Sequence, residues 1–282
     1  MNEVFDKKKA DRMAFEWRYI ITDMICRSGS GHIGGALSIV EILHTLYYRI
    51  MNVDPDNPKW SGRDRLVLSK GHAAPALYMA LAEKGFFPKT WLKTLNLDGT
   101  KLPSHADART VPGIDATTGS LGQGLSVACG MSFAARINKK DHNVFCIIGD
   151  GESNEGQNWE AGMFAAHNKL DNLVAITDYN KLQIDGTTDE ILSLEPLVDK
   201  WKAFGWEVFE MNGHDWDDVY NTLKAAREVK GKPSMVIAHT IKAKGCSIVE
   251  GTAGSHNIKV PDQAAYEKFM NALEAQDVEL PY

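Results

Sequence analysis

The sequence predicts an α/β fold in which a parallel β-sheet is covered by helices on both faces. Short and almost continuously apolar segments, such as residues 144–148 and 235–239, recur along the chain, and strands buried on both faces of a parallel sheet have this character. Longer segments with apolar residues at helical spacing alternate with them, as in α/β folds. No repeat, low-complexity tract or linker rich in Pro, Gly or Ser divides the chain, so we predict a single domain over residues 1–282.

The expected elements follow in order from the local pattern. Helices are predicted where apolar residues recur at helical spacing, and residues 28–35 are predicted to form a loop because their glycines disfavour a helix interior. Apolar runs predict the strands. The helices are expected at 10–28, 36–50, 73–84, about 155–168, 215–229 and about 262–273, and the strands at 65–69, 144–148, 172–177, 206–210 and 235–239.

The composition excludes several classes of protein. The net charge is −6, and nothing resembles the basic patch of a nucleic-acid-binding protein or a polybasic membrane anchor. No apolar stretch of about 18 residues predicts a membrane span. The four cysteines contain no CxxC pair, which fits free thiols in a reducing compartment. We therefore expect a cytoplasmic protein with no nucleic-acid or membrane partner.

Polar side chains follow two successive predicted strands. Asp150 stands after the strand 144–148, and Asn180 stands after the strand 172–177. A carboxylate and an amide oxygen suit Mg²⁺, which commonly binds through one or two protein groups and the phosphates of a ligand. Gly151 permits close approach of a diphosphate, and the helix that follows presents free N–H groups to an anion. The sequence therefore predicts a metal-bridged diphosphate site.

Two other interpretations of this segment stay open on its residues alone. Asp150 can simply cap a strand–helix turn made by its neighbouring glycines. A dinucleotide-binding fingerprint would need the spacing G-x-G-x-x-G, and Gly156 comes too late for it.

Four of the nine histidines stand in Gly- or Ser-containing segments of predicted loops. They are His32, His72, His105 and His256. Loops beyond strand ends commonly build functional sites, and histidine both donates and accepts protons near neutral pH. We therefore expect these four side chains to take part in acid–base chemistry.

Taken one by one, these segments resemble those of the transketolases, enzymes that use thiamine diphosphate. The matching segments include Ser30-Gly31-His32, Leu68 to His72, Thr117 to Gly124, Gly149-Asp150-Gly151 with Glu155, Asn180 and Gly254-Ser255-His256. The resemblance covers nearly the whole chain and implies the diphosphate-binding (PP-type) domain of that family. Residues 106–111 and 245–255 have no secure match apart from the Gly254 segment, so the contacts of His256 are the least defined.

The resemblance also implies roles for individual residues. The metal would be held by Asp150, Asn180 and the backbone carbonyl of Leu182. His72 and His105 would face the hydroxyls of the donor sugar, whereas His32 and His256 would stabilise charge on oxygen and relay protons. Glu155 would join a carboxylate network across a subunit contact. The implied cofactor-binding residues are His72, Gly119, Leu121, Gly151, Glu155, Asn180, Ile184 and His256.

A complete transketolase has more than twice this length, so the resemblance implies that a separate C-terminal transketolase subunit supplies the pyrimidine-binding and C-terminal domains. We expect a heterotetramer with two copies of each chain. It would transfer a two-carbon ketol unit from a ketose phosphate to an aldose phosphate in the pentose phosphate pathway. The cofactors would be thiamine diphosphate and Mg²⁺, for which Ca²⁺ or Mn²⁺ can substitute.

Other functions remain as alternatives. One is a split transketolase specialised for a sulfonated or branched sugar, and another is the α subunit of a 2-oxo acid dehydrogenase, which would not need four histidines. A deoxyxylulose-phosphate synthase relative would keep its domains in one chain. A catalytically inactive scaffold would be expected to have lost Asp150, Asn180 or the histidines, and a nicotinamide dehydrogenase would need the missing glycine spacing.

Overall fold

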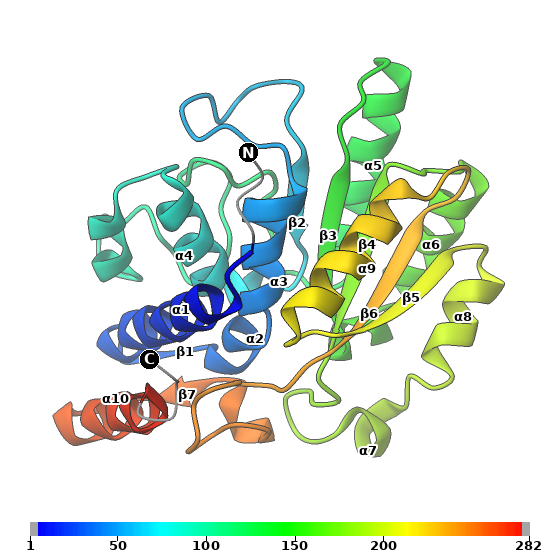
Figure 1. Ribbon diagram of the computed structural model, residues 1–282. Coiled ribbons are helices and arrows are strands. Elements are labelled where there is room, and N and C mark those ends of the chain that lie inside the picture. The colour runs from blue at the N-terminus through cyan, green and yellow to red at the C-terminus, as the bar shows by residue number, and fades with distance from the viewer. Residues whose placement is uncertain (1–4, 278–282) are drawn as a thin grey trace.

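The computed structural model describes residues 5–277, and its centre is a five-stranded parallel sheet (Figure 1). Every neighbouring pair of strands is parallel, which confirms the predicted fold class. Each strand lies within two residues of its expected bounds. In spatial order the strands are β2 (Arg65–Leu68), β3 (Val144–Gly149), β4 (Leu173–Tyr179), β6 (Ser234–His239) and β5 (Glu207–Asn212).

The strands contribute alternate residues to two different cores. On β3, Phe145 and Ile147 belong to one cluster of buried residues, whereas Cys146 and Ile148 belong to the other. Successive side chains of a strand point to opposite faces of the sheet, so both faces are buried. This arrangement explains why the strand sequences are apolar throughout and do not alternate between apolar and polar residues.

Helices cover each face of the sheet (Figure 1). One core receives side chains from α1 (Lys7–Arg27), α3 (Val40–Thr45), α4 (Ala74–Lys84), α9 (Trp216–Glu228) and α10 (Gln263–Asp277). The other receives side chains from α5 (Gln123–Ile137), α6 (Gly156–His167) and α8 (Leu197–Ala203). The sequence pattern did not predict α5 or α8. Within residues 5–277, no helix has the length and apolar character needed to cross a membrane.

Two predictions about the first third of the chain are wrong. The last part of the expected glycine loop, residues 33–35, belongs instead to the short helix α2 (Ile33–Leu37), with Gly34 inside it. A Cβ atom at Gly34 would lie 2.7 Å from Ser255 Oγ and 2.9 Å from Lys242 Cγ, so close packing accounts for the glycine. The helix expected at 36–50 is broken: Ile39 leaves helical geometry before α3, and residues 46–50 form a π-helical turn.

The cysteines are free, as expected, and all four are buried. They are Cys26, Cys129, Cys146 and Cys246.

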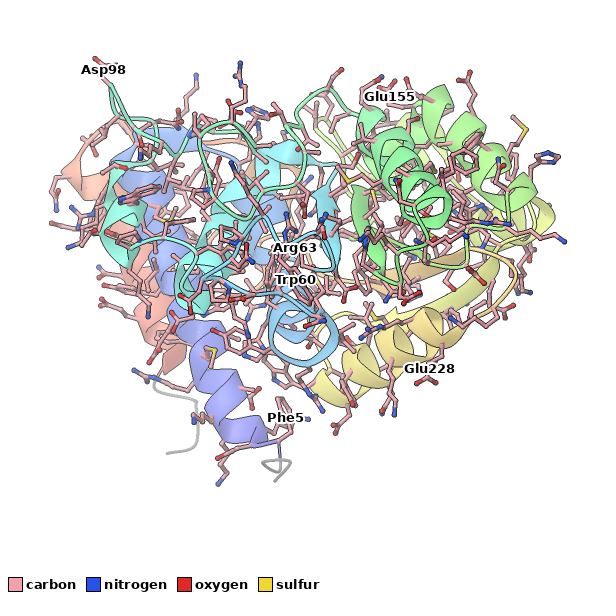
Figure 2. All side chains as sticks on the ribbon, turned by 90° about the horizontal axis from the view of Figure 1, so that it is seen from above. Phe5, Trp60, Arg63, Asp98, Glu155 and Glu228 are labelled. Atoms are coloured by element: carbon pink, nitrogen blue, oxygen red, sulfur yellow. The ribbon has the colours of Figure 1, made fainter. Side chains whose placement is uncertain are left out.

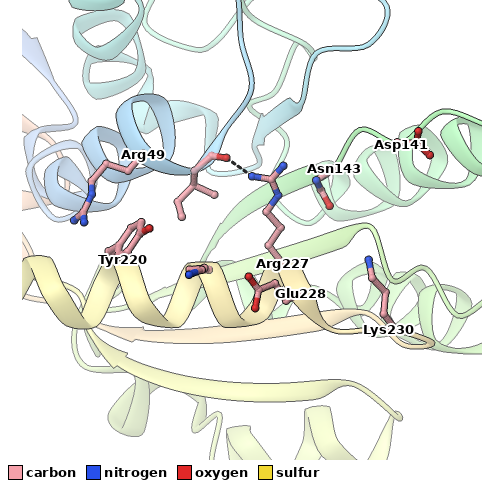
Figure 3. Close-up of a pocket in the computed structure, with 9 residues that line it drawn as sticks. Arg49, Asp141, Asn143, Tyr220, Arg227, Glu228 and Lys230 are labelled. Carbon is pink, nitrogen blue, oxygen red and sulfur yellow. Dashed lines mark hydrogen bonds between the residues drawn. The ribbon is translucent and has the colours of Figure 1, made fainter. Parts of the chain in front are cut away.

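A hollow opens at the amino ends of the strands, where Asn143 precedes β3 and Lys230 lies shortly before β6 (Figure 3). Arg227 donates a hydrogen bond to the Ile50 carbonyl on its wall. The candidate site described next lies at the opposite, carboxyl ends of the strands.

Candidate active site

The four histidines expected to act together form one cluster. The centroid of the His32 ring lies 5.1 Å from that of His72, 5.6 Å from that of His105 and 5.2 Å from that of His256. The His72 and His256 rings are also 5.2 Å apart. Four segments far apart in the sequence therefore meet in this histidine cluster.

Short elements hold the four histidine segments together. The strand β1 (Ser30–Gly31), just before His32, pairs with β7 (Ile258–Lys259), just after His256. Tyr78 donates a hydrogen bond to the His105 carbonyl at 3.0 Å. A Cβ atom at Gly119 would lie 3.3 Å from the His105 ring, so the expected cofactor segment packs directly against this histidine.

The surroundings of His32, His72 and His256 favour their neutral imidazoles. Burial lowers the pKa of His32, and His105 and Lys242 lower it further. Burial together with Lys70 holds the pKa of His72 well below its ordinary value. Burial and Lys242 lower the pKa of His256 to about 4. Neutral imidazoles can each donate and accept a hydrogen bond, so they suit a ligand that carries several hydroxyl groups.

The expected metal ligands also meet, at the carboxyl ends of β3 and β4. Asp150 is 2% exposed, and its carboxylate accepts hydrogen bonds from the Gly151 and Lys181 amides. Asn180 Oδ1 accepts from the Leu182 amide at 3.1 Å. The two strand ends are in register, since Gly149 pairs with Asp178. One loop contact therefore brings the three predicted ligand residues together.

The donor set fits a hard divalent cation. It consists of a carboxylate, an amide oxygen and a backbone carbonyl, which are ligands that Mg²⁺ accepts when a phosphate completes its coordination. Burial and the nearby Asp178 raise the pKa of Asp150 to about 7, so a cation there would stabilise its ionised form. No group of three or more His, Cys, Asp or Glu side chains within residues 5–277 is arranged to hold a metal.

Residues 9–269 match the family model described as "Transketolase, thiamine diphosphate binding domain". The chain belongs to the transketolase family. This is a family of transferases, and the assignment confirms the resemblance carried by the histidine and diphosphate segments.

Two similar proteins are themselves named as transketolase subunits. The chain is 55% identical over 246 residues to the 6-deoxy-6-sulfo-D-fructose transketolase subunit SqwG of Clostridium sp., covering 87% of this chain and 90% of that protein. It is 46% identical over 248 residues to an apulose-4-phosphate transketolase subunit of Phocaeicola vulgatus, covering 88% of each.

Solved transketolases share the fold. The structure of the Campylobacter jejuni enzyme superposes with a TM-score of 0.85 at 32% sequence identity, covering 98% of this chain and 48% of that one. The transketolase of Leishmania mexicana superposes with a TM-score of 0.83 at 28% identity and is covered to 45%. The chain thus spans about half the length of the solved transketolases that it matches.

Two buried lysines of this transketolase domain were missed by the sequence interpretation. Lys70 Nζ donates to Asp178 Oδ2 at 2.6 Å and to the Gly35 carbonyl at 2.7 Å. Lys242 is 3% exposed, and its Nζ donates to the Leu182 carbonyl oxygen at 2.9 Å. Lysines are rarely buried without a partner. The sequence pattern that could have identified them is their position: Lys70 and Lys242 each follow the end of a strand by two or three residues.

Glu152 is a second residue that the transketolase motif left unassigned. It is buried, and its carboxylate accepts hydrogen bonds from the Gly122 amide at 2.8 Å, from the Gly149 amide at 2.9 Å and from the Ser69 hydroxyl. Burial raises the pKa of Glu152, although these three donors oppose the shift. The side chain thus joins the ends of β2 and β3 to the loop that contains the expected cofactor residues Gly119 and Leu121.

Three further expected site residues are not among the histidine rings that contact one another. Glu155 is exposed at the N-terminal end of α6, at the periphery of the molecule in Figure 2. Ile184 is 60% exposed. A Cβ atom at Gly151 would lie 2.8 Å from Gln183 Cβ, so the packing of Gln183 is itself sufficient reason for this glycine. The roles of these three residues stay predictions.

Proposed function

We propose that this chain is the diphosphate-binding subunit of a split transketolase, active only with a separate partner chain. The observation that carries the proposal is the convergence of the histidine cluster with Asp150, Lys70 and Lys242 in one domain of the transketolase family. The reaction is the transfer of a two-carbon ketol unit from a ketose phosphate, or a related ketose, to an aldose phosphate.

The diphosphate end of the cofactor fits the loop contact between β3 and β4. Asp150, Asn180 and the Leu182 carbonyl would hold Mg²⁺, with Ca²⁺ or Mn²⁺ as substitutes, and Lys70 and Lys242 would supply further positive charge. When bound, thiamine diphosphate supplies the stabilised carbanion that cleaves a carbon–carbon bond. Gly119, Leu121, Gly151, Ile184 and Glu155 are further candidate contacts of the cofactor or of the subunit that completes its site.

The histidine cluster provides the proton chemistry that a sugar needs. His72 and His105 would hold the donor hydroxyls, and His32 and His256 would stabilise charge on oxygen and move protons. Because the pKa of three of these side chains is lowered, their rings are neutral at pH 7, and each has one nitrogen that can accept a hydrogen bond or a proton from a hydroxyl.

An exposed apolar patch supports the expectation of a partner chain. Ile184, Ile191 and Leu192 are 60%, 50% and 59% exposed, and they follow directly after the candidate metal ligands. Clustered exposed apolar side chains commonly mark interfaces. We assign this patch to the chain that carries the rest of the transketolase, since similar proteins are named as subunits. Two copies of each chain would then form the heterotetramer.

The donor sugar has two candidates. A general transketolase would use sugar phosphates of the pentose phosphate pathway. The 55% identity to a 6-deoxy-6-sulfo-D-fructose transketolase subunit favours a donor that carries a sulfonate instead of a phosphate. The two donors differ in their phosphate or sulfonate group, and both would present the same ketol end to the histidine cluster. The free, buried cysteines support a reducing compartment, and the cytoplasmic location stays a prediction.

The test is reconstitution with a separate C-terminal transketolase subunit from the same organism. Thiamine diphosphate and Mg²⁺ are titrated into each chain and into the mixture, and ketol transfer is assayed with fructose 6-phosphate and with 6-deoxy-6-sulfofructose. We expect transfer only in the mixture and its loss in Asp150→Asn. Cofactor binding without transfer from either sugar would redirect the assignment to 2-oxo acids. No cofactor binding in any sample would overturn the proposal.

A further inference from the structure

His214, between β5 and α9, uses both nitrogens of its ring. Its Nδ1 lies 3.1 Å from Glu41 Oε2, and its Nε2 accepts a hydrogen bond from the Ile241 amide at 2.9 Å. Because Nε2 is the acceptor, the proton of the neutral ring is on Nδ1 and is donated to Glu41. The two contacts therefore fix both the tautomer and the orientation of the imidazole.

Glu41 is itself held in place from a different helix. It is 5% exposed, and both of its carboxylate oxygens lie 2.7 Å from Nη2 of Arg18 on α1. Burial raises the pKa of Glu41, but Arg18 and His214 outweigh this effect and lower the pKa to about 2. Glu41 is therefore an ionised acceptor at neutral pH. Arg18, Glu41 and His214 form one chain of hydrogen bonds, in which Arg18 and Glu41 are buried and His214 is partly buried.

The Ile241 amide belongs to residues 240–243, which leave β6 and enter the candidate site. Several contacts attach this segment to the site or its loops. The Thr240 amide donates to the Tyr179 carbonyl at 3.3 Å and the Thr240 hydroxyl to Asp178. Lys242 Nζ donates to the Leu182 carbonyl at 2.9 Å, the Lys242 carbonyl accepts from the Gly251 amide at 2.8 Å, and the Ala243 amide donates to the Gly34 carbonyl at 3.0 Å. The contact of Ile241 instead reaches His214. Rotation of the Ile241 peptide would move the adjoining Lys242 away from the Leu182 carbonyl.

We propose that His214 is a positioning residue for the diphosphate end of the site: supported by Glu41 and Arg18, it fixes the Ile241 amide and so holds Lys242 against the Leu182 carbonyl. The inference rests on the proposed function, because it assigns the placement of Lys242 to cofactor binding. Replacing a group that orients a metal-ligating side chain commonly changes metal affinity by about 10- to 100-fold, and we expect an effect at the lower end of this range for a lysine placed beside the metal-binding carbonyl.

A pair of substitutions separates the two contacts of His214. The Gln side-chain oxygen is as many bonds from Cβ as Nε2 is, so His214→Gln keeps an acceptor for the Ile241 amide and loses the donor to Glu41. The Asn side-chain nitrogen corresponds to Nδ1, so His214→Asn keeps the donor and loses the acceptor. Amide hydrogen exchange of residues 240–243 is measured in the cofactor-free chain. The Kd for thiamine diphosphate with Mg²⁺ is measured in the complex with the partner subunit.

We expect faster exchange of the Ile241 amide and a Kd raised about tenfold in His214→Asn, with both close to wild type in His214→Gln. A merely structural role would lower the Tm of both variants, leave their Kd values equal to that of wild type, and overturn the inference. Equal exchange of the Ile241 amide in both variants would also overturn it. Absence of cofactor binding by the wild-type complex would instead overturn the proposed function, and the inference with it.

Discussion

Lys242 donates a hydrogen bond from Nζ to the Leu182 carbonyl oxygen at 2.9 Å, with 3% of the lysine exposed. Burial lowers the pKa of Lys242, while Asp150 and Asp178 raise it. The positive charge of Lys242 affects two parts of the candidate site. It lies at the carbonyl expected to bind the metal, and it lowers the pKa of His32 and His256.

Lys242→Met should therefore raise the pKa of His256 from about 4 toward its ordinary value, and that of His32 in the same direction. Removing a nearby positive charge makes the protonated imidazole less unfavourable. The measurement is an NMR titration of the imidazole resonances in the cofactor-free chain. Lys244→Met is the matched control, because Lys244 pairs with Glu250 and is not among the groups that shift either histidine. Unchanged histidine titration in Lys242→Met would contradict the prediction.

Two glycines of α5 should respond in opposite ways to alanine. A Cβ atom at Gly124 would lie 2.6 Å from Ser69 Cα, whereas one at Gly130 would meet nothing within 4 Å. Gly124→Ala should destabilise the chain by about 1–3 kcal/mol through overpacking. Gly130→Ala should stabilise it by about 0.5–1 kcal/mol, because alanine loses less conformational entropy in a helix. Urea unfolding of the two variants measures both, and effects of the same sign would show that the close approach of α5 to Ser69 is wrong.

His44 should make the chain less stable in acid. It is 5% exposed, its ring is stacked on Tyr48 with centroids 4.7 Å apart, and neither ring nitrogen has a hydrogen-bond partner among the described residues. Burial, and then Arg49, lowers its pKa to about 4. In the unfolded chain the pKa of a histidine is about 6.5, so the unfolded chain binds the proton more tightly than the folded chain does. The free energy of unfolding is therefore unaffected by His44 above about pH 6.5 and decreases as the pH falls toward 4.

His44→Phe should remove this acid-induced loss of stability, which amounts to about 3 kcal/mol once the pH has fallen below the folded pKa. It should also remove two buried polar atoms that lack a partner. The free energy of unfolding of both proteins is measured from pH 7.5 to pH 4. We expect the wild type to lose stability more steeply with acid, and parallel curves would count against a buried neutral His44.

The exposed apolar patch beside the candidate metal ligands should control assembly. Leu192→Glu places a charge in a surface that we assign to the partner chain, and burying an unpaired carboxylate is strongly unfavourable. We expect the Kd of the two chains to rise by at least about tenfold. Leu97→Glu changes a residue of similar exposure, 53% against 59%, in a different loop and should leave the Kd unchanged. Analytical ultracentrifugation measures both, and equal affinities would place the interface elsewhere.

Much of the sheet could be predicted, because burial of both faces makes the strands continuously apolar. The helix α5 could not, because its small residues, among them Gly124 and Gly130, obscure the apolar period. Gly124 is set by its close packing against Ser69, just after the end of β2. The same holds for Gly34 in α2. In these places tertiary contacts decide the residue type, and local propensity misleads.

The residues of the candidate site likewise include some that the sequence could predict and some that it could not. The histidines and Asp150 could be found because each stands in a segment with a family motif, and the structure brings them together. Lys242 and His214 could not, because their significance depends on partners far away in the chain: Leu182 for the lysine, and Glu41 and Ile241 for the histidine. The lowered pKa values of His32, His72 and His256 likewise depend on burial, which no single segment reveals.

The two-residue pairing of β1 with β7 joins Ser30 to Lys259, near the two ends of the described chain. During synthesis the whole five-stranded sheet and three of the four histidines leave the ribosome before His256 and β7 do. Contacts between residues so far apart in sequence form late in folding. The histidine cluster is therefore completed only after almost the entire domain has been made, and a nascent chain that stops before residue 253 would contain the sheet without a finished site.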